Sequence, residues 1–430
     1  MKKKIQNKIL KVLSNFKFNK EKFIPGTTVI PVTGKVIDKS EVIHIVKSAL
    51  DGWLTAGRFN NDFEKKLANF IEIKNLITVN SGSSANLVAF STLTSYKLKE
   101  RQILPGDEII TVATSFPTTL NPFISYGAIP VFVDIKIPTY NIDESLVENA
   151  ITEKTKAIVV AHTLGNPFNI AEISRICKKY NLWLIEDCCD ALGAKFDGKH
   201  VGTFSDLSTL SFYPAHHITM GEGGAVFTNN LRLKRIAESF RDWGRDCFCD
   251  PGKNNTCGKR FEWKLGDLPF GYDHKYIYTH LGYNLKITDM QAACGLAQLK
   301  KLKSFVKQRI KNFEYLKSRL KKFEEYFILP EATKNSQPSW FGFPLSIREG
   351  KFERNELISF LSSKNIDTRL LFAGNIIKQP YMINRKFRIS GDLKNSDYVM
   401  NNTFWIGVFP GLKKKHLNYV CKAIEEFLNK

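Results

Sequence analysis

Three cysteines crowd into residues 247–257 of this 430-residue chain and form a first candidate site. One residue separates Cys247 from Cys249, and seven residues separate Cys249 from Cys257. The chain carries eight cysteines and no recognisable export signal at its start, so we expect reduced thiols or metal ligands rather than disulfides. Because a Cys-x-Cys pair suits zinc as well as an iron–sulfur cluster, the thiols alone predict a metal site of either kind.

Asp187 closes a very apolar run, residues 182–185, and forms a second candidate site. A carboxylate at the end of a buried strand needs a partner. Either a protonated heterocyclic nitrogen of a ligand or the cation of a structural salt bridge meets that need. Cys189 lies two residues further on and points the same way as Asp187 if the strand persists, whereas Cys188 points into the packing.

A run of small hydroxyl residues and one glycine, residues 80–86, precedes an apolar helical stretch. Free N–H groups at such a helix start bind anions, phosphate among them. The same composition also makes an ordinary N-cap, so the run by itself leaves both interpretations open.

These candidate residues need elements that position them. Apolar runs at residues 108–112, 131–133, 157–160 and 182–185 have the length of strands, and residues 144–152 and 170–180 have helical patterns between them. Alternating strands and helices predict an α/β fold with a mostly parallel sheet and helices on both faces. In such folds the ligand lies at the carboxyl ends of the strands, where Asp187 stands.

The chain divides into three predicted parts. Residues 1–35 form a basic N-terminal segment, and residues 36–300 form a large domain. Within it, residues 244–281 lack an apolar period and form a cysteine-bearing insertion of the kind that is usually functional or disordered. Residues 301–430 comprise a linking amphipathic helix and a small C-terminal domain.

The net charge of +21 attracts anions, whether nucleic acid, an acidic membrane or a nucleotide substrate. The basic residues are spread over several stretches and resemble no nucleic-acid-reading module, so we expect no nucleic-acid partner; a Lys-rich solvated surface is the plainer interpretation. No apolar run reaches the ~18 residues of a membrane span, and the basic start lacks a signal-peptide core, so we expect a cytoplasmic protein.

Residues 211–228 resemble the active-site stretch of the DegT/DnrJ/EryC1/StrS sugar aminotransferases, a family of pyridoxal-phosphate (PLP) enzymes. In this sequence the stretch contains Ser211-Phe212-Tyr213-Pro214-Ala215-His216 and the turn Gly221-Glu222-Gly223-Gly224. Further matching segments are Gly52-Trp53-Leu54-Thr55-Ala56-Gly57, Val131-Phe132-Val133-Asp134, Glu186-Asp187 and Gly282-Tyr283-Asn284-Leu285-Lys286. The resemblance runs from about Gly52 to about Leu302 and more loosely to the end. It implies the PLP-dependent transferase fold (aspartate aminotransferase type I), with a large, mostly parallel sheet domain and a smaller C-terminal α/β domain.

The resemblance also implies the roles of individual residues. Gly82, Ser83 and Ser211 match groups that bind the cofactor phosphate, and Phe116 matches the aromatic ring that stacks on the cofactor. Asp187 matches the carboxylate that keeps the pyridine nitrogen protonated. Two weaker matches are substrate contacts, Thr55 and Arg369, the latter toward a diphosphate; an exposed or ion-paired arginine is the alternative. Asn284 matches a residue that reaches the phosphate of a neighbouring subunit, so a homodimer is expected.

One position departs from the family pattern. His216 stands where the family has the lysine that forms an imine with the cofactor. An imidazole forms no stable imine, so the site is expected to hold pyridoxamine phosphate (PMP) without a covalent bond. His216 is then expected to act as the catalytic base, because its pKa suits neutral pH. The neighbouring His217 falls outside the pattern and is interpreted as structural.

The replacement of lysine by histidine resembles a subgroup, the sugar 3-dehydratases, which has two branches. One acts on GDP-4-keto-6-deoxymannose without iron. The other acts on CDP-4-keto-6-deoxy-D-glucose, carries a [2Fe–2S] cluster, and begins the synthesis of 3,6-dideoxyhexoses for lipopolysaccharide O-antigens. The cluster branch has four cysteines with 57, one and seven residues between them, and Cys189, Cys247, Cys249 and Cys257 match that spacing.

The resemblance therefore implies dehydration of a CDP-4-keto-6-deoxyhexose at C3, with PMP and a [2Fe–2S] cluster as cofactors. A separate flavin and iron–sulfur NADH-dependent reductase is the implied partner, and it reduces the dehydrated sugar. Three alternatives stay open: the iron-free GDP-sugar dehydratase, an ordinary sugar aminotransferase, and a non-enzymatic metal-binding or nucleic-acid-binding protein.

Overall fold

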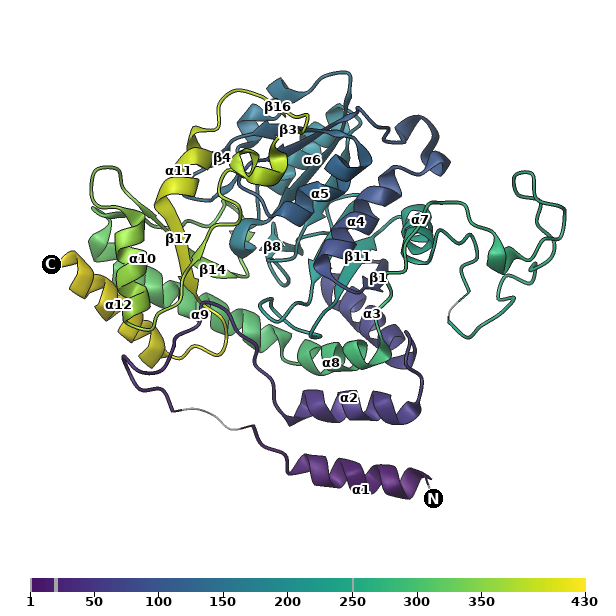
Figure 1. Ribbon diagram of the computed structural model, residues 1–430, viewed down its shortest axis with the longest axis horizontal. Coiled ribbons are helices and arrows are strands. Elements are labelled where there is room, and N and C mark those ends of the chain that lie inside the picture. Colours follow the sequence, from purple (N-terminus) through teal and green to yellow (C-terminus); the bar gives the residue numbers. More distant parts are fainter. Residues whose placement is uncertain (1, 19–21, 250) are drawn as a thin grey trace.

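The structure is a computed structural model that describes residues 2–18, 22–249 and 251–430 (Figure 1). Its centre is an eight-stranded sheet with the order β1-β11-β10-β7-β6-β2-β3-β16. Strand β11 is antiparallel to both of its neighbours, and the other neighbouring pairs are parallel. The strands are β1 (Asn75–Val79), β2 (Glu108–Val112), β3 (Ile129–Val133), β6 (Thr155–Ala161), β7 (Trp183–Asp187), β10 (Leu207–Ser211), β11 (Gly224–Thr228) and β16 (Arg388–Ile389).

Helices cover both faces of this sheet because its strands are apolar on both sides. One face is packed by α4 (Gly82–Leu93), α5 (Pro117–Tyr126) and α7 (Leu231–Arg241). The opposite face is packed by α3 (Arg58–Ile71), α6 (Ile170–Lys179) and α8 (Asp289–Leu299). The predicted α/β class, with a mostly parallel sheet, is thereby confirmed. Helix α2 (Lys39–Asp51) packs on α8, and α1 (Lys2–Ser14) lies beneath α2 at the bottom of Figure 1.

A second, antiparallel sheet of four strands lies beside the large one, in the order β12-β14-β17-β15. Its strands are β12 (Phe327–Ile328), β14 (Gly342–Ile347), β17 (Thr403–Gly407) and β15 (Arg369–Leu370). It shares a separate apolar core with three helices: α9 (Leu302–Leu320), α10 (Arg354–Ser363) and α12 (Lys414–Leu428). The same C-terminal region also returns a strand, β16, to the edge of the large sheet beside β3, and α11 (Lys394–Asn402) packs on β14, β17 and β4.

Short elements complete the fold. Two small sheets lie apart from the large one: β4 (Ile135–Lys136) pairs with β5 (Asn141–Ile142), and β8 (Lys195–Phe196) pairs with β9 (Lys199–His200) and β13 (Ser336–Gln337). The helix expected over residues 144–152 is wrong: that stretch makes two short 3-10 turns, Glu144–Leu146 and Glu148–Ala150. Asp143 and Val147 start these turns, and each turn ends after three residues. No helix in the described part of the chain is long and apolar enough to cross a membrane.

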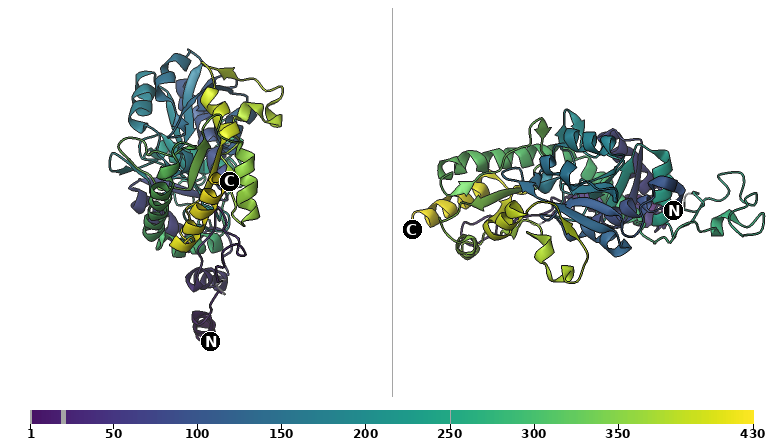
Figure 2. Two further views of the ribbon diagram at one scale, coloured as in Figure 1. Left: turned by 90° about the vertical axis from the view of Figure 1, so that its left-hand side faces the viewer. Right: turned by 90° about the horizontal axis from the view of Figure 1, so that it is seen from above.

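Residues 244–281 project from the body as a long arm, seen at the right of Figure 1 and again in the view from above in Figure 2. The described arm residues contain little regular structure beyond one 3-10 turn, His274–Tyr276. The two ends of the arm are clamped together, because Trp243 N–H donates to the Tyr283 carbonyl at 2.6 Å. Gly244 has φ +79°, and a Cβ there would lie 1.8 Å from the His280 carbonyl oxygen, so only glycine fits this crossing.

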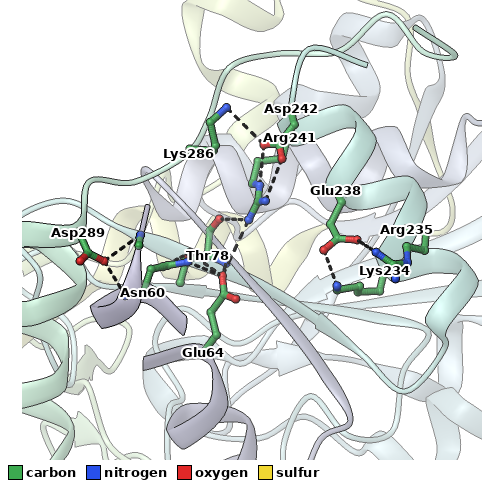
Figure 3. A network of polar contacts seen from close by, with 11 residues as sticks. Asn60, Glu64, Thr78, Lys234, Arg235, Glu238, Arg241, Asp242, Lys286 and Asp289 are labelled. Carbon is green, nitrogen blue, oxygen red and sulfur yellow. Dashed lines mark hydrogen bonds and ion pairs between the residues drawn. The ribbon is translucent and has the colours of Figure 1, made fainter. Parts of the chain in front are cut away.

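Charged side chains anchor the base of the arm to the large domain (Figure 3). Arg241, at the end of α7, pairs with Asp242 through Nε to Oδ1 at 2.9 Å, and its Nη1 donates to the Thr78 carbonyl at 3.2 Å. Lys286, just after the arm, lies 3.5 Å from the same Asp242 carboxylate. Burial and these partners fix both ends of the arm on β1 and α7, so the arm leaves the body from a rigid base.

Candidate active site

A cavity of about 720 Å³ lies at the carboxyl ends of the parallel strands, between the large sheet and the small one. This is the position at which doubly wound α/β folds bind ligands. The sequence-predicted residues that line it are Gly82, Ser83, Phe116, Asp187, Cys189, Ser211, His216 and Arg369. They come from α4, the start of α5, β7, β10, β15 and the loops after β7 and β10, so the fold brings together residues that are up to 287 positions apart (82 to 369).

Asp187 ends β7 at the floor of the cavity and is buried. Asn86 of α4 donates its Nδ2 to Asp187 Oδ2 at 2.8 Å, and Thr119 of α5 donates its hydroxyl to the same oxygen at 2.7 Å. Cys189 N–H donates to Asp187 Oδ1 at 3.1 Å. Within the described residues no cation pairs with this carboxylate, so the salt-bridge interpretation fails. Neutral donors hold the Asp187 carboxyl group in place, and it remains available to a cationic ligand atom.

The helix start at residues 81–84 faces the same cavity. The Ser81 side chain caps α4 by accepting the Ser84 N–H at 3.0 Å, and Gly82 and Ser83 form the first turn. A Cβ at Gly82 would lie 2.4 Å from the Ser211 Cβ, so glycine permits the end of β10 to approach the helix. The Ser81 contact confirms that the run caps the helix. A helix N-terminus with a hydroxyl beside it suits a phosphate group, and anion binding here stays a prediction.

His216 lines the cavity from the loop after β10, and its ring packs 5.3 Å from the Phe341 ring. Its Nδ1 lies 3.4 Å from Oδ1 of Asp190. Burial raises the pKa of the Asp190 carboxyl, and the neighbouring His216 opposes that rise. With Nδ1 turned to Asp190, Nε2 is the ring nitrogen left for proton transfer in the cavity. No lysine is found among the described residues that line this cavity.

Sequence reasoning missed the residues that hold His216 in place. Arg309 of α9 is buried and donates through Nη2 to the carbonyls of Ala215 and His216 at 3.4 and 3.3 Å. Desolvation lowers the pKa of Arg309 to about 9, while Asp190 acts against that shift. The helical spacing of apolar residues predicted α9 only as a linking helix. Nothing in the local sequence indicates that Arg309 is buried. Asp190, three residues after Asp187, was the more accessible signal.

His217 does not line the cavity. It is buried, its Nε2 lies 2.6 Å from the Ser339 carbonyl oxygen, and desolvation lowers its pKa well below the usual value. These contacts agree with the structural role expected for it.

Two predicted contacts lie toward the mouth of the cavity. Phe116 caps the start of α5, is half exposed, and meets the Phe372 ring edge-on at 6.3 Å. Arg369 lies on β15 of the small sheet, and its Nη1 donates to the Thr368 carbonyl at 2.8 Å. No carboxylate of the described residues pairs with Arg369, so its charge faces the cavity unpaired.

Thr55 and Asn284 lie outside the cavity within one chain. Thr55 is exposed, and its backbone forms an isolated antiparallel β-bridge with Thr288. Asn284 is exposed at the base of the arm, where it accepts a hydrogen bond from Lys286 Nζ at 2.9 Å. Their expected roles, in substrate binding and at the phosphate of a neighbouring subunit, therefore stay predictions.

The four cysteines of the predicted cluster fall into two places. Cys247, Cys249 and Cys257 surround one small pocket in the arm, together with Arg260, His274 and Lys275. Cys189 instead lines the main cavity beside Asp187. One chain therefore assembles three of the four thiols, and the role of Cys189 as a cluster ligand stays a prediction.

The remaining cysteines behave as core residues. Cys177, Cys294 and Cys421 are buried, and burial raises the pKa of the first and last to about 12 and of Cys294 to about 11. Cys188 is also buried, next to a hydrogen-bonded pair in which His162 Nε2 lies 3.0 Å from Glu186 Oε2. Those three form the one His, Cys, Asp or Glu group in the described residues whose ligand atoms lie within 4.8 Å of one another. Gly202 N–H also donates to Glu186 at 2.9 Å, and the group fixes the strand ends beside Asp187.

Comparison with known proteins matches residues 36–425 to the model of the DegT/DnrJ/EryC1/StrS aminotransferase family. The chain belongs to that family. The family predicted from residues 211–228, the PLP-dependent transferase fold and the enzymatic character that came with it are confirmed.

Among curated proteins, the chain is 63% identical over 406 residues to a lipopolysaccharide biosynthesis protein, RfbH, of Salmonella typhimurium, covering 94% of this chain and 93% of that one. It is 50% identical over 409 residues to the dTDP-4-dehydro-2,6-dideoxy-D-glucose 3-dehydratase of Saccharopolyspora spinosa, covering 95% and 88%. A solved structure of a GDP-4-keto-6-deoxymannose-3-dehydratase from E. coli with bound hydrated PLP is similar with a TM-score of 0.83 and 31% identity, covering 92% of this chain and 99% of that one.

Proposed function

We propose that this protein is a PMP-dependent nucleotide-sugar 3-dehydratase that acts on CDP-4-keto-6-deoxy-D-glucose in 3,6-dideoxyhexose synthesis for O-antigens. The observation that carries the proposal is that one cavity contains both His216 and a buried Asp187 with uncharged hydrogen-bond donors, while no lysine is found among its described lining residues. An aminotransferase of this family needs a lysine to bind and release its cofactor, so the lining opposes that alternative. The names of relatives with 3-dehydratase activity add support.

The residues present fit PMP. The α4 start with Gly82 and Ser83 suits its phosphate, Phe116 lies at the position for stacking, and Asp187 suits a protonated pyridine nitrogen. Asn86 and Thr119 keep the Asp187 carboxylate oriented toward the cavity. The chemistry that PMP supplies when bound is an amine for the sugar's C4 ketone and an electron-withdrawing ring.

His216 is proposed as the general base that takes a proton from the cofactor carbon next to that amine, C4′. Asp190 orients the ring through Nδ1, and Arg309 holds the backbone carbonyl of His216, so the base stays in one place during the reaction. Removal of the C3 hydroxyl as water follows from loss of that proton. Phe341 packs against the His216 ring, whose side chain is 16% exposed, and so limits the contact of the base with water.

The substrate is proposed from charge and from the family subgroup. Arg369 offers an unpaired guanidinium to the diphosphate, and the net charge of +21 favours an anionic nucleotide sugar. The choice of CDP as the nucleotide depends on the cysteine spacing, which matches the cluster-bearing branch. A GDP-linked or dTDP-linked 4-keto sugar is the second candidate, because relatives that are 34% and 50% identical carry those substrates in their names.

The arm cysteines are proposed to hold a [2Fe–2S] cluster. Cys247, Cys249 and Cys257 share one pocket with the cationic side chains of Arg260 and Lys275, which suit an anionic cluster. Cys189, which lines the main cavity, is the predicted fourth ligand. Replacement of the C3 hydroxyl by hydrogen consumes two electrons and two protons and releases water. A flavin and iron–sulfur reductase that draws on NADH is proposed to supply the electrons.

A homodimer is also proposed. Large apolar side chains stand exposed along the arm and its base, including Tyr276, Tyr278 and Leu281, of which Leu281 is 93% exposed. Such a concentration marks an interaction surface. We further propose that the protein works in the cytoplasm, where nucleotide sugars are made and thiols stay reduced.

Turnover of CDP-, dTDP- and GDP-linked 4-keto-6-deoxy sugars with PMP, each with and without a reductase, tests the proposal. We expect dehydration of the CDP sugar at the highest kcat/KM and net deoxygenation only with the reductase. Amino transfer to the sugar without loss of the C3 hydroxyl would overturn the dehydratase assignment. Preference for another nucleotide would overturn CDP alone.

A further inference from the structure

The basic N-terminal segment takes no part in the site described above, and its charge is one-sided. Residues 2–18 contain six lysines and neither aspartate nor glutamate. Most of this segment folds into helix α1, Lys2–Ser14, whose first turn contains no acidic residue. Lysines at a helix N-terminus oppose the helix dipole and destabilise the helix. An anionic partner beside α1 removes that penalty.

Helix α1 is an outlying element of the molecule (Figures 1 and 2). It packs on α2, and α2 packs on α8. Lys39, at the start of α2, donates from Nζ to the Ser14 carbonyl at 2.8 Å and holds the end of α1. The half-buried residues of α1 are Gln6, Ile9, Leu10 and Leu13. This side of the helix is therefore turned to α2, and the other side faces solvent.

The solvent side of α1 carries a row of positive charge. Lys4, Lys8 and Lys11 are exposed, and their spacing of four and three residues places them on one face of the helix. A lysine side chain can lay its methylene stem along apolar surface and still keep its ammonium group in contact with water or a headgroup. This row is therefore suited to a flat, negatively charged surface.

Apolar side chains stand exposed beside this row. Val12 lies one turn after Lys8 and is 72% exposed. The helical turn continues past α1, because the Phe16 N–H donates to the Leu13 carbonyl at 3.0 Å. Phe16 is 44% exposed and meets the Phe18 ring edge-on, with centroids 5.0 Å apart. An apolar stripe flanked by lysines is typical of helices that lie in the interface of a membrane.

Charge separates the possible occupants of this surface. A second copy of the chain carries the same net charge of +21, and repulsion between two lysine rows opposes its approach. The phosphates of a nucleic acid would pair with the lysines but leave Val12 in water. An anionic bilayer accommodates both kinds of group, because its headgroups pair with the lysines and its acyl boundary takes up the apolar side chains.

We propose that α1 and the residues that follow it to Phe18 dock this protein on the surface of an anionic phospholipid membrane. Lys4, Lys8 and Lys11 contact the headgroups, and Val12 and Phe16 enter the boundary with the acyl chains. This docking does not depend on the reaction proposed above, because none of the described residues of α1 lines the cavity.

The test is flotation of the full chain with two kinds of vesicle, one of pure phosphatidylcholine and one of equal parts phosphatidylcholine and phosphatidylglycerol. We expect the wild type to bind the mixed vesicles alone, with an affinity that falls as salt rises from ~0.1 M to ~0.5 M. The triple variant Lys4→Gln, Lys8→Gln, Lys11→Gln should bind the mixed vesicles on the order of 100-fold more weakly.

Helix α9 supplies a matched control, since Lys303, Lys307 and Lys311 are exposed on it at a similar spacing. The triple variant Lys303→Gln, Lys307→Gln, Lys311→Gln removes the same charge and should keep the wild-type affinity. The double variant Val12→Ser, Phe16→Ser keeps every charge and should weaken binding at least about tenfold. Circular dichroism and turnover of the nucleotide sugar without vesicles should not change in any variant, which separates lost docking from misfolding.

Equal binding to both kinds of vesicle, binding to neither, or equal losses in the two triple variants would each overturn the proposal. Salt-sensitive binding to duplex DNA or RNA without binding to vesicles, lost in the α1 triple variant, would assign this surface to a nucleic acid instead. A wild type that ignores vesicles and an apolar double variant with a lower sedimentation coefficient would assign it to a second copy.

Discussion

The cavity at the carboxyl ends of the sheet and the projecting arm hold their reactive groups by different means. Asp187 stands on a buried strand and receives hydrogen bonds from two packed helices, α4 and α5. The arm thiols stand on a segment with little regular structure, clamped at its base by Arg241 and Asp242 (Figure 3). The core of the fold therefore positions the groups of the cavity, whereas the arm depends on its own polar contacts and on its ligand.

The largest effect is expected at the base in the cavity. His216→Asn keeps the shape of the loop but removes the proton acceptor, so we expect water loss from the nucleotide sugar to fall on the order of 10³-fold. PMP affinity should change little, because Asp187 and the α4 start remain. Sugar turnover measured by nuclear magnetic resonance, with PMP binding by calorimetry as the control, checks this. Dehydration at the wild-type rate would show that another group is the base.

A substitution in the arm should affect the metal site and leave the cavity unchanged. Cys247→Ser removes one of three thiols in the arm pocket, so we expect iron content and net deoxygenation to fall together by at least about tenfold. Solvent hydrogen exchange at the cofactor C4′ should persist, since the cavity residues are untouched. Iron analysis and deuterium incorporation in the same preparation separate the two regions. Unchanged iron content would exclude Cys247 as a ligand and weaken the division between cavity and arm.

A smaller effect is expected where the helix and strand meet. Gly82→Ala puts a Cβ 2.4 Å from the Ser211 Cβ, so the start of α4 must shift away from β10. Such overpacking costs about 1–3 kcal/mol, and PMP affinity should drop with it. Ser83→Ala is the matched control, because it keeps the backbone N–H groups and adds no atoms. Chemical denaturation and PMP titration measure the two consequences; equal behaviour of both variants would contradict the close approach.

The smallest effect concerns the arm base and pH. His280 lies between the hydroxyls of Ser95 and Ser239, at 2.7 and 2.8 Å, and burial lowers its pKa from 6.5 to about 4. The unfolded chain therefore binds a proton more readily between these values, and stability is lost as pH falls from 6.5 toward 4. Because the ring is partly solvated, we expect this one residue to contribute about 1 kcal/mol.

Denaturation of the wild type and His280→Asn at pH 7 and pH 4.5 isolates that contribution, since the other buried histidines are common to both proteins. The variant should lose less stability on acidification than the wild type. An identical loss of stability in both proteins would show that His280 does not contribute to the pH dependence of unfolding.

Much of the cavity was predictable because its signals are local or belong to a family pattern. The strand that ends at Asp187, the capped helix start at Gly82 and the histidine at position 216 are each visible in a short stretch of residues. The helix expected over residues 144–152 was wrong because two short 3-10 turns are enough to bury Val147 and Ala150 from the same apolar spacing. Asn86 and Thr119 were missed because a polar residue inside a helix carries no sign of which carboxylate it meets.

By itself, the sequence determined the α/β class, the family and the chemistry available at Asp187, His216 and the cysteines, since these depend on residue type and on periods within one element. Only the tertiary structure decided which groups meet: Arg309 under the His216 loop, Asp190 beside its ring, and the three arm cysteines around one pocket. These contacts depend on burial and on the packing of segments that are distant in the sequence, and no local pattern of residues encodes them.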